Sequence, residues 1–410
     1  MSINCRLCDN KIEEPFLSLG NSPVSNAYLS KTDLNKMEPY YPLELYVCPD
    51  CFLVQLEEFE KSQNIFNSNY AYFSSYSESW LKHCKEYVDM MLNRFKFNEN
   101  SFVLEVASND GYLLQYFKEK NINVLGVEPT SNTAEVAIKK GIPTDIKFFN
   151  TDYAKGMHDN SRLADLIIGN NVLAHNPYLN DFVNGLKLAL NSNGIVTMEF
   201  PHLLKLIDNN EFDTVYHEHY SYFSFYTVQR LFENHQLTIF DVDEIPTHGG
   251  SLRIYAKHSA DESKEISGNV AKLLEKEKTF GLKKLETYFE FSKIVEETKR
   301  NLLKFLIEAK EQNKSVAAYG APAKGNTLLN YCGIRTDLID YTVDRSPYKQ
   351  NHFLPGIHIP IFHPDKIKET KPDYVLILPW NIKEEISEQM NFIKEWGGKF
   401  VVPIPTIQVF

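Results

Sequence analysis

The chain has 410 residues, which at roughly 100–200 residues per domain is enough for two or three domains. Lys and Arg number 43 against 54 Asp and Glu, and this net charge of −11 argues against a nucleic-acid-binding surface, which needs a basic patch. No run approaches the roughly 18 apolar residues of a membrane-spanning helix. The first residues lack the charged and apolar regions of a signal peptide, so we expect a cytoplasmic protein without membrane or nucleic-acid partners.

Four of the six cysteines form two Cys-x-x-Cys pairs in an N-terminal segment rich in proline and turn residues. In a reducing compartment such pairs indicate a metal site rather than disulfides. Four sulfurs around one ion leave no open position for water, which predicts a structural zinc ion; iron in the same cage and chance pairing are the alternatives. The predicted ligands are Cys5, Cys8, Cys48 and Cys51. The remaining cysteines, Cys84 and Cys332, are predicted to be buried, inert thiols.

From residue 102 onward, strand-like apolar runs alternate with helical spacing, which is typical of a parallel sheet covered by helices. A first sheet is predicted from the runs Phe102–Val106, Val124–Val127, Leu166–Ile168 and Gly194–Met198. A charged stretch without proline, about 261–312, predicts helices that lead into a further unit. A second parallel sheet is predicted from the runs Ser315–Tyr319, Asp340–Val343, Tyr374–Leu378 and Phe400–Val402.

The turn after the first strand is the predicted cofactor site. It keeps a single glycine, so the G-x-G-x-x-G cradle for a pyrophosphate is absent. Glu128 ends the second strand, where a carboxylate can accept hydrogen bonds from both ribose hydroxyls. This favours S-adenosylmethionine, which has a ribose but no phosphate, over a structural turn or another adenosine ligand. The predicted cofactor-binding residues are Glu105, Ala107, Ser108, Asn109, Gly111, Glu128, Pro129, Asn170 and Asn171.

The segment 215–223 holds two imidazoles, a carboxylate and three phenols, which suits proton transfer near neutral pH. A metal site of His217, Glu218 and His219 and simple aromatic packing are the alternatives. A second aromatic and hydroxyl cluster, Tyr70–Ser77, lies at a predicted domain junction, where pockets form. His175 follows the Leu166–Ile168 strand and is expected at the ligand-binding edge of the sheet, although a lone histidine there is more often structural.

Taken together, these motifs resemble the zinc-containing sugar C-methyltransferases, which act on nucleotide-linked 4-keto-deoxysugars. The resemblance covers nearly the whole chain. It is carried by the two cysteine pairs and the segments 72–79, 104–114, 171–175, 216–219, 248–253 and 319–326. It implies an α/β fold with a zinc-binding domain (1–69), a Rossmann-like S-adenosylmethionine domain (70–258) and a second Rossmann-like domain (259–410), with the sugar nucleotide held between the last two.

The resemblance also implies roles for individual side chains. His219 is the expected base that removes the hydrogen on carbon 3 of the sugar, which the ketone at carbon 4 acidifies. Glu218 would orient His219 or bind the sugar, and Tyr216 would lie close to the reacting oxygens. Tyr76 and His175 would complete the polar lining of the site and stabilise the developing oxyanion.

The loop after the first strand of the second sheet is the predicted site for the substrate's diphosphate. Gly320 and Gly325 let a ligand approach the backbone, the following helix N-terminus favours an anion, and Lys324 adds a positive charge. The alternative is a sheet kept only for packing. The predicted substrate-binding residues are Tyr222, His248, Arg253, Gly320, Lys324, Asn326, Arg345 and Lys349.

The predicted activity is therefore methyl transfer from S-adenosylmethionine to carbon 3 of a nucleotide-linked 4-keto-6-deoxyhexose, through an enolate. A monomer is expected, with an oligomer as the alternative. An O- or N-methyltransferase acting on a similar sugar is the first alternative, because it would also use a base. A zinc-ribbon binding protein without catalysis is the second alternative.

Overall fold

The computed structural model describes residues 2–66, 68 and 72–410. The chain divides into two compact units, each assembled from three stretches of sequence. The first unit contains residues 1–12, 48–202 and 220–283, and the second contains residues 13–47, 203–219 and 284–410. The interval between the two cysteine pairs therefore folds mostly with the second unit. The sequence predicted three consecutive domains, 1–69, 70–258 and 259–410. These boundaries stay a prediction, because the compact units combine stretches from different parts of the chain.

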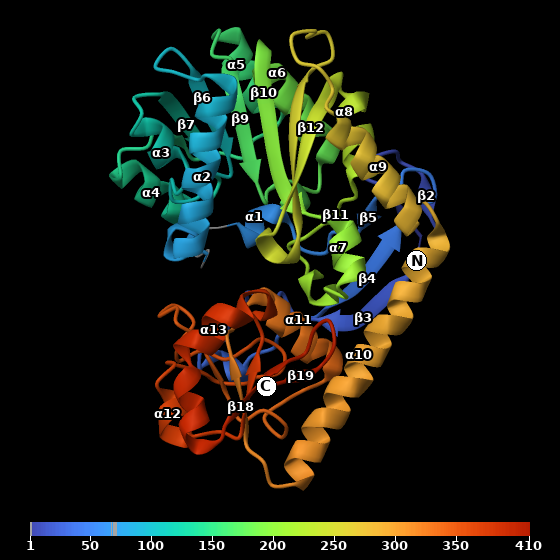
Figure 1. Cartoon of the computed structure of the whole chain (residues 1–410), viewed down its shortest axis with the longest axis vertical. Coiled ribbons are helices and arrows are strands. Elements are labelled where there is room, and N and C mark those ends of the chain that lie inside the picture. Colours follow the sequence, from blue (N-terminus) through green and yellow to red (C-terminus); the bar gives the residue numbers. More distant parts are fainter. Residues whose placement is uncertain (1, 67, 69–71) are drawn as a thin grey trace. The chain divides into compact units, whose positions relative to one another are not determined.

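The first unit is built on a seven-stranded sheet with the order β12-β13-β10-β9-β6-β7-β8. The five strands from β10 to β8 are parallel, and β13 and β12 complete the sheet as antiparallel strands. Figure 1 shows β6, β9 and β10 side by side. The strands are β6 (Phe102–Val106), β7 (Asn123–Val127), β8 (Thr144–Asp145), β9 (Ala164–Asn170), β10 (Leu190–Pro201), β12 (Leu237–Ile245) and β13 (Ser251–His258).

The strand order reverses at β6, because the chain proceeds outward through β7 and β8 and then returns to the other side through β9 and β10. In open α/β sheets, ligands bind beyond the carboxyl ends of the strands at such a switch point. The four residues after Phe102 in β6 are all buried, as a strand covered on both faces requires. The sheet thus places the turn after β6 where a ligand is expected.

Helix α2 (Glu78–Phe95) shows how the sequence directs packing onto this sheet. Its buried residues, at positions 84, 87, 88 and 91, recur at helical spacing and form one apolar stripe. The stripe packs into a cluster with sheet residues such as Val103 and Tyr255. Ser77 caps the helix by accepting a hydrogen bond from the backbone N–H of Trp80, a contact worth about 1 kcal/mol.

The other elements of the first unit are short. The remaining helices are α1 (Ser62–Ile65), α3 (Leu114–Lys118), α4 (Ser131–Lys139), α5 (Thr151–Asp159), α6 (Leu179–Ala189), α8 (Phe225–Asn234) and α9 (Gly268–Phe280). Single 3-10 turns are η2 (Ser74–Tyr76), η3 (Leu173–His175) and η5 (Thr247–Gly249). Two antiparallel pairs complete the unit: β1 (Ile3–Asn4) with β2 (Lys11–Ile12), and β5 (Val54–Gln55) with β11 (Ser221–Tyr222).

The second unit is built on a six-stranded sheet with the order β16-β15-β14-β17-β18-β19, in which only β19 runs antiparallel to its neighbour. Its switch point is β14. The strands are β14 (Val316–Tyr319), β15 (Thr342–Val343), β16 (Ile361–Phe362), β17 (Tyr374–Ile377), β18 (Lys399–Val402) and β19 (Gln408–Val409). The predicted α/β class with two mainly parallel sheets is confirmed.

Helix α10 (Leu285–Glu311) is the longest helix in Figure 1, and its buried residues again follow helical spacing from Tyr288 to Ala309. The other helices of the second unit are α7 (Leu203–Asp208), α11 (Ala323–Cys332), α12 (Lys366–Thr370) and α13 (Lys383–Gln389). Its 3-10 turns are η1 (Asp33–Asn35), η4 (Phe212–Thr214), η6 (Trp380–Ile382) and η7 (Asn391–Trp396), and β3 (Leu17–Ser22) pairs antiparallel with β4 (Tyr41–Val47). Within the described part of the chain, every helix is too short or too polar to cross a bilayer.

Candidate functional site

The two cysteine pairs form a single cluster in the first unit. Both pairs sit in turns of the same design: the backbone N–H of the first cysteine donates to the carbonyl five residues ahead, and its own carbonyl accepts from the residue four ahead. Asp9 and Phe52, at equivalent places in the two turns, both have positive φ. The four sulfurs lie within 4.8 Å of one another, with 3.4 Å between Cys5 and Cys51.

Zinc fits this cluster. A tetrahedral ion with bonds of about 2.3 Å spaces its sulfurs by about 3.8 Å, which the observed separations approach without any rearrangement of the backbone. Among the described residues these cysteines form the one group of three or more metal-binding side chains. The metal interpretation of His217, Glu218 and His219 therefore gains no support. Cys84 and Cys332 are buried away from the cluster, as predicted.

The turn after β6 takes a conformation that few residues adopt. Ala107, Asn109 and Gly111 all have positive φ, and the N–H of Ala107 donates to the carbonyl of Val127. A Cβ added to Gly111 would come within 3.0 Å of Ile142, so glycine also provides room there. The turn is thereby held against the end of β7.

Glu128, directly after β7, is buried and binds the same turn. Its Oε2 accepts from the backbone N–H of Asn109 at 2.8 Å, and its Oε1 accepts from the N–H of Thr130 at 2.8 Å. Burial raises the pKa of Glu128, while these hydrogen bonds oppose the rise. The structure therefore brings together Asn109 and Glu128, two of the predicted cofactor-binding residues.

Buried acceptors at this edge suit a cationic ligand. Glu105 is fully buried on β6, and neither of its carboxylate oxygens has a well-formed hydrogen bond within the described chain. Burial, together with the nearby Glu128 and Asp110 carboxylates, raises the pKa of Glu105 well above its usual range, although the Tyr112 hydroxyl opposes this. S-adenosylmethionine carries a sulfonium and an ammonium group, which would compensate such carboxylates, whereas a phosphate would be repelled.

The carboxyl ends of β9 and β10 bring further predicted residues together. Asn171 has positive φ, donates its N–H to the Glu199 carbonyl at 2.7 Å, and places its Nδ2 3.2 Å from Nε2 of His248. His175 makes an edge-on ring contact with Phe66, with centroids 5.6 Å apart.

Other predicted residues of the first unit differ in exposure. Tyr76 is 65% exposed, and its ring lies 5.6 Å from that of Phe73. Tyr222, on β11, is buried. Tyr70 and Ala71 of the predicted aromatic cluster lie outside the described residues.

Arg253 lies within an ion-pair network in the first unit. Its guanidinium is buried, donates to Oε2 of Glu199 at 3.0 Å and lies over the ring of Tyr87. His83 contacts both partners of this pair, and Thr247 donates to Glu199 at 3.0 Å. Removing one partner of such a buried pair typically costs about 3–5 kcal/mol, so Arg253 has a structural role whatever it binds.

In the second unit, the ring of His219 is held at both nitrogens. Nδ1 lies 3.0 Å from the carbonyl oxygen of Thr214, and Nε2 lies 2.8 Å from the hydroxyl of Tyr216. A carbonyl only accepts, so Nδ1 carries the proton and the lone pair of the neutral ring is on Nε2. Three predicted catalytic residues, Tyr216, Glu218 and His219, thus come from one short segment.

Glu218 is 2% exposed, and its Oε1 accepts a hydrogen bond from Nδ2 of Asn26 at 2.7 Å. Burial raises the pKa of Glu218 to about 7, against the opposing effect of Asn26. Neighbouring His217 instead faces the Pro42 carbonyl at 3.1 Å. Sequence reasoning missed Asn26, because nothing in the local pattern of residues 13–47 connects it to the catalytic segment.

The loop between β14 and α11 has the tight geometry predicted for it. Gly320 has a φ of 91°, and a Cβ there would come within 2.6 Å of the Pro379 ring. The N–H of Ala321 donates to the Asp344 carboxylate at 2.8 Å, and Lys349 donates to the Ala321 carbonyl at 2.9 Å. The first two amides of the loop are therefore used by the chain itself, that of Gly320 by the Val343 carbonyl and that of Ala321 by Asp344.

Lys324 lies beside two buried acids. Its ammonium group is 4.7 Å from the centre of the Trp380 ring, whose N–H donates to Asp213 at 2.7 Å. Burial raises the pKa of Asp213 to about 6 and that of Glu211 to about 7, and the charge of Lys324 opposes both shifts. Asn326 is buried in α11, and the side chain of Arg345 is 68% exposed, 4.0 Å from Glu385.

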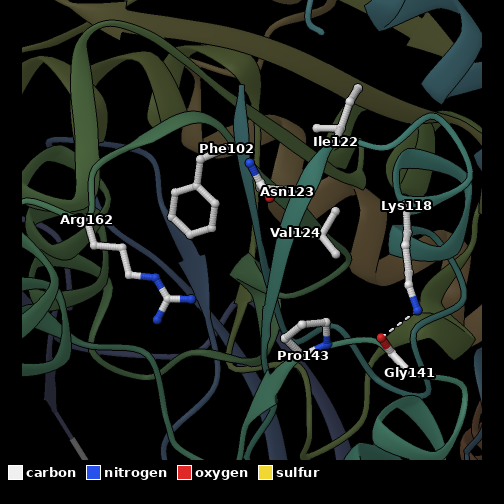
Figure 2. Close-up of a pocket in the computed structure, with 8 residues that line it drawn as sticks. All are labelled: Phe102, Lys118, Ile122, Asn123, Val124, Gly141, Pro143 and Arg162. Carbon is white, nitrogen blue, oxygen red and sulfur yellow. Dashed lines mark hydrogen bonds between the residues drawn. The ribbon is translucent and has the colours of Figure 1, made fainter. Parts of the chain in front are cut away.

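A cavity of about 540 Å³ opens elsewhere, at the amino ends of β6 and β7 (Figure 2). Phe102, Val124 and Arg162 line it, and Lys118 on its rim donates to the Gly141 carbonyl at 2.7 Å. Ligands of open α/β sheets bind at the opposite, carboxyl ends of the strands, and none of the predicted site residues lines this cavity.

Comparison with known proteins agrees with the zinc cluster and the methyltransferase-type sheet. Three domain families match in succession: a zinc binding domain (residues 5–66), a methyltransferase domain (80–242) and the C-methyltransferase C-terminal domain (246–405). The chain is also 34% identical over 405 residues to C-methyltransferase NovU of Streptomyces niveus, covering 99% of this chain and 96% of NovU.

The chain is thus an S-adenosylmethionine-dependent methyltransferase with a structural zinc site. It belongs to the C-methyltransferase family that includes NovU.

Solved structures similar to part of the chain include two methyltransferases. One is an S-adenosylmethionine-dependent methyltransferase from Anabaena variabilis (16% identity, TM-score 0.37, 50% of this chain and 99% of that chain). The other is magnesium protoporphyrin IX methyltransferase from Synechocystis with bound S-adenosylmethionine (10% identity, TM-score 0.33, 43% of this chain and 78% of that chain).

Replacing a cluster cysteine tests the zinc site. We expect Cys48→Ser to reduce bound zinc from about one ion per chain to well below that and to lower the melting temperature, because metal binding contributes directly to folding. Cys332→Ala, outside the cluster, is the control and should keep its zinc. Metal content by plasma mass spectrometry gives the result, and undiminished zinc in Cys48→Ser would contradict the site.

Replacing Glu128 tests the cofactor site. Glu128→Ala should raise the dissociation constant of S-adenosylmethionine about 10-fold to 100-fold, because a hydrogen bond to a charged group contributes about 1.5–3 kcal/mol. Isothermal titration calorimetry measures the change. The exposed Glu135 on α4 gives the control, Glu135→Ala, and equal affinities for the two variants would remove Glu128 from the cofactor site.

Proposed function

We propose that this C-methyltransferase adds a methyl group to carbon 3 of a nucleotide-linked 4-keto-6-deoxyhexose. The observation that carries the proposal is the geometry of His219, whose Nδ1 faces the Thr214 carbonyl and whose Nε2 faces the Tyr216 hydroxyl. The chain thereby presents a neutral imidazole with its lone pair in a known direction. Such a base suits removal of a hydrogen next to a ketone.

The reaction proceeds in two bond exchanges. His219 takes the proton from carbon 3, and the electron pair of the broken C–H bond delocalises onto the oxygen at carbon 4 as an enolate. S-adenosylmethionine supplies the methyl group as an electrophile. Carbon 3 of the enolate then forms a bond to the methyl carbon, the bond from that carbon to sulfur breaks, and its electron pair leaves with S-adenosylhomocysteine.

Tyr216 and Glu218 have defined tasks in this scheme. The Tyr216 hydroxyl donates to Nε2 in the free protein, and the substrate's carbon 3 hydrogen takes its place when the sugar binds. The displaced hydroxyl can then donate to a sugar oxygen. Glu218 accepts hydrogen bonds from sugar hydroxyls. Tyr76 and His175 remain candidates for donors to the enolate oxygen, each worth about 3–4 kcal/mol.

The diphosphate of the sugar nucleotide is assigned to the loop between β14 and α11. Lys324 and Lys349 provide positive charge there, and α11 begins at Ala323, so that its N-terminus favours an anion. Asn326 and Arg345 remain candidates for the nucleoside or phosphate end. In the first unit, Tyr222, His248 and Arg253 remain candidates for sugar contacts.

The zinc site also bears on where the enzyme works. Four thiolates that must stay reduced to bind the ion suit a reducing compartment. We therefore propose a cytoplasmic monomer whose partner is its small-molecule substrate.

Substituting His219 tests the base. His219→Asn should lower turnover about 10²-fold to 10⁴-fold. The protein is incubated in heavy water with dTDP-, GDP- and CDP-linked 4-keto-6-deoxysugars, with and without S-adenosylmethionine, and the products are read by mass spectrometry. Wild-type protein should incorporate deuterium at carbon 3 without the cofactor and a methyl group with it, and His219→Asn should do neither at a comparable rate.

The exposed His363, in the same unit, supplies the control variant His363→Asn, which should behave as wild type. Methyl gain without carbon 3 exchange would instead indicate transfer to oxygen or nitrogen. Near wild-type turnover in His219→Asn would exclude His219 as the base.

Substituting Lys324 tests the diphosphate site. Lys324→Ala should raise KM for the sugar nucleotide about 10-fold to 100-fold, because a charge-assisted hydrogen bond to phosphate is lost. The exposed Lys368 on α12 gives the control, Lys368→Ala. Steady-state kinetics at saturating S-adenosylmethionine provide the measurement, and an unchanged KM would favour a sheet kept for packing.

A further inference from the structure

Asn26 comes from the segment between the two cysteine pairs but lies in the second unit, against the catalytic segment. Its side-chain amide is half-buried and donates to Oε1 of Glu218 at 2.7 Å, a short hydrogen bond to a fully buried carboxyl group. An amide N–H can only donate, so this contact is favourable when Glu218 is ionised and is lost or inverted when that oxygen carries a proton.

Tyr28 lies between Asn26 and the predicted diphosphate loop. The Tyr28 hydroxyl donates to the Ala321 carbonyl at 2.6 Å and lies 3.3 Å from Oδ1 of Asn26. Lys349 donates to the same carbonyl and lies over the Tyr28 ring, 5.4 Å from its centre. The amide of Asn26 is oriented by its own bond to Glu218, and Tyr28 packs beside it.

We propose that Asn26 is a positioning residue of the reaction, which holds the Glu218 carboxylate ionised and in one orientation while Tyr28 ties this pair to the Gly320–Lys324 loop. This inference rests on the proposed function of Glu218 as an acceptor for sugar hydroxyls. It assigns to the loop between the cysteine pairs a part in catalysis beside its part in metal binding.

The contact between Asn26 and Glu218 affects how much of the Glu218 carboxyl group is ionised. Burial raises the pKa of Glu218 to about 7, and the Asn26 hydrogen bond opposes the rise. Titratable groups around this contact include Tyr216, His217 and His219 on the same segment. Tyr28 lies opposite, and the charges of Lys349, Asp344 and Glu218 act on it. Loss of the Asn26 donor therefore raises the pKa further, and less of the carboxylate is ionised at pH 7.

The first test reads Glu218 without substrate. Full-length protein labelled with carbon-13 at glutamate carboxyl groups is titrated by NMR, and Glu218→Gln identifies the signal. Asn26→Asp keeps the shape of the side chain but replaces the donor by an acceptor, so the pKa of Glu218 should rise by about one unit or more. Asn35→Ala, an exposed asparagine of the same segment, should leave it unchanged.

The second test reads the reaction. The acidic limb of the kcat profile for methyl transfer should move to higher pH in Asn26→Asp by the same amount, while KM for S-adenosylmethionine stays within about twofold of wild type. Asn26→Ala, which removes the donor without adding charge, should move the limb in the same direction. Circular dichroism and the melting temperature establish that each variant is folded.

The outcomes separate the two proposals. An unmoved Glu218 pKa in both Asn26 variants, or a uniform loss of activity with an unmoved pH limb, would overturn the positioning role. The pKa of Glu218 could also shift in the Asn26 variants while the wild-type protein methylates none of the 4-keto sugars. Asn26 would then still set the pKa of Glu218, but the proposed substrate class and the catalytic part of this inference would be overturned.

Discussion

Four thiolates on one metal ion are the constraint on which the arrangement of the chain depends. The ion joins Cys5 and Cys8 to Cys48 and Cys51, and so closes a loop whose interior, residues 13–47, folds with the other compact unit. Closing a long loop is costly in entropy for a free chain, and coordination compensates for this cost. The closed loop thus restricts the conformations open to residues 13–47 before they pack within the second unit.

The two sheets share one hydrogen-bonding arrangement at their switch points. In the first unit the N–H of Asn109, after β6, donates to Glu128 after β7. In the second unit the N–H of Ala321, after β14, donates to Asp344 after β15. In each case an acid after the second strand accepts a hydrogen bond from the turn after the first strand, and this bond restrains the turn.

Local patterns allowed the sheets, the zinc ligands and the turn after β6 to be predicted, because buried runs, paired cysteines and a glycine turn are contiguous in sequence. The contacts of Glu218 with Asn26 could not be predicted, since a hydrogen bond between distant segments leaves no periodic trace in either one. Arg253 was predicted among the substrate-binding residues, and the structure shows it in a buried pair with Glu199. Charge in a sequence does not reveal which partner neutralises it.

Because each compact unit combines distant stretches of the chain, a chimera of two related proteins can separate residues that contact each other. A crossover placed after the second cysteine pair would carry the metal ligands from one parent together with β3, β4 and Asn26, which belong to the second unit. The recipient's Glu218 would then meet a foreign neighbour. A chimera keeps the native Asn26–Glu218 contact when residues 13–47 and 203–219 come from the same parent, although these segments are far apart in the sequence.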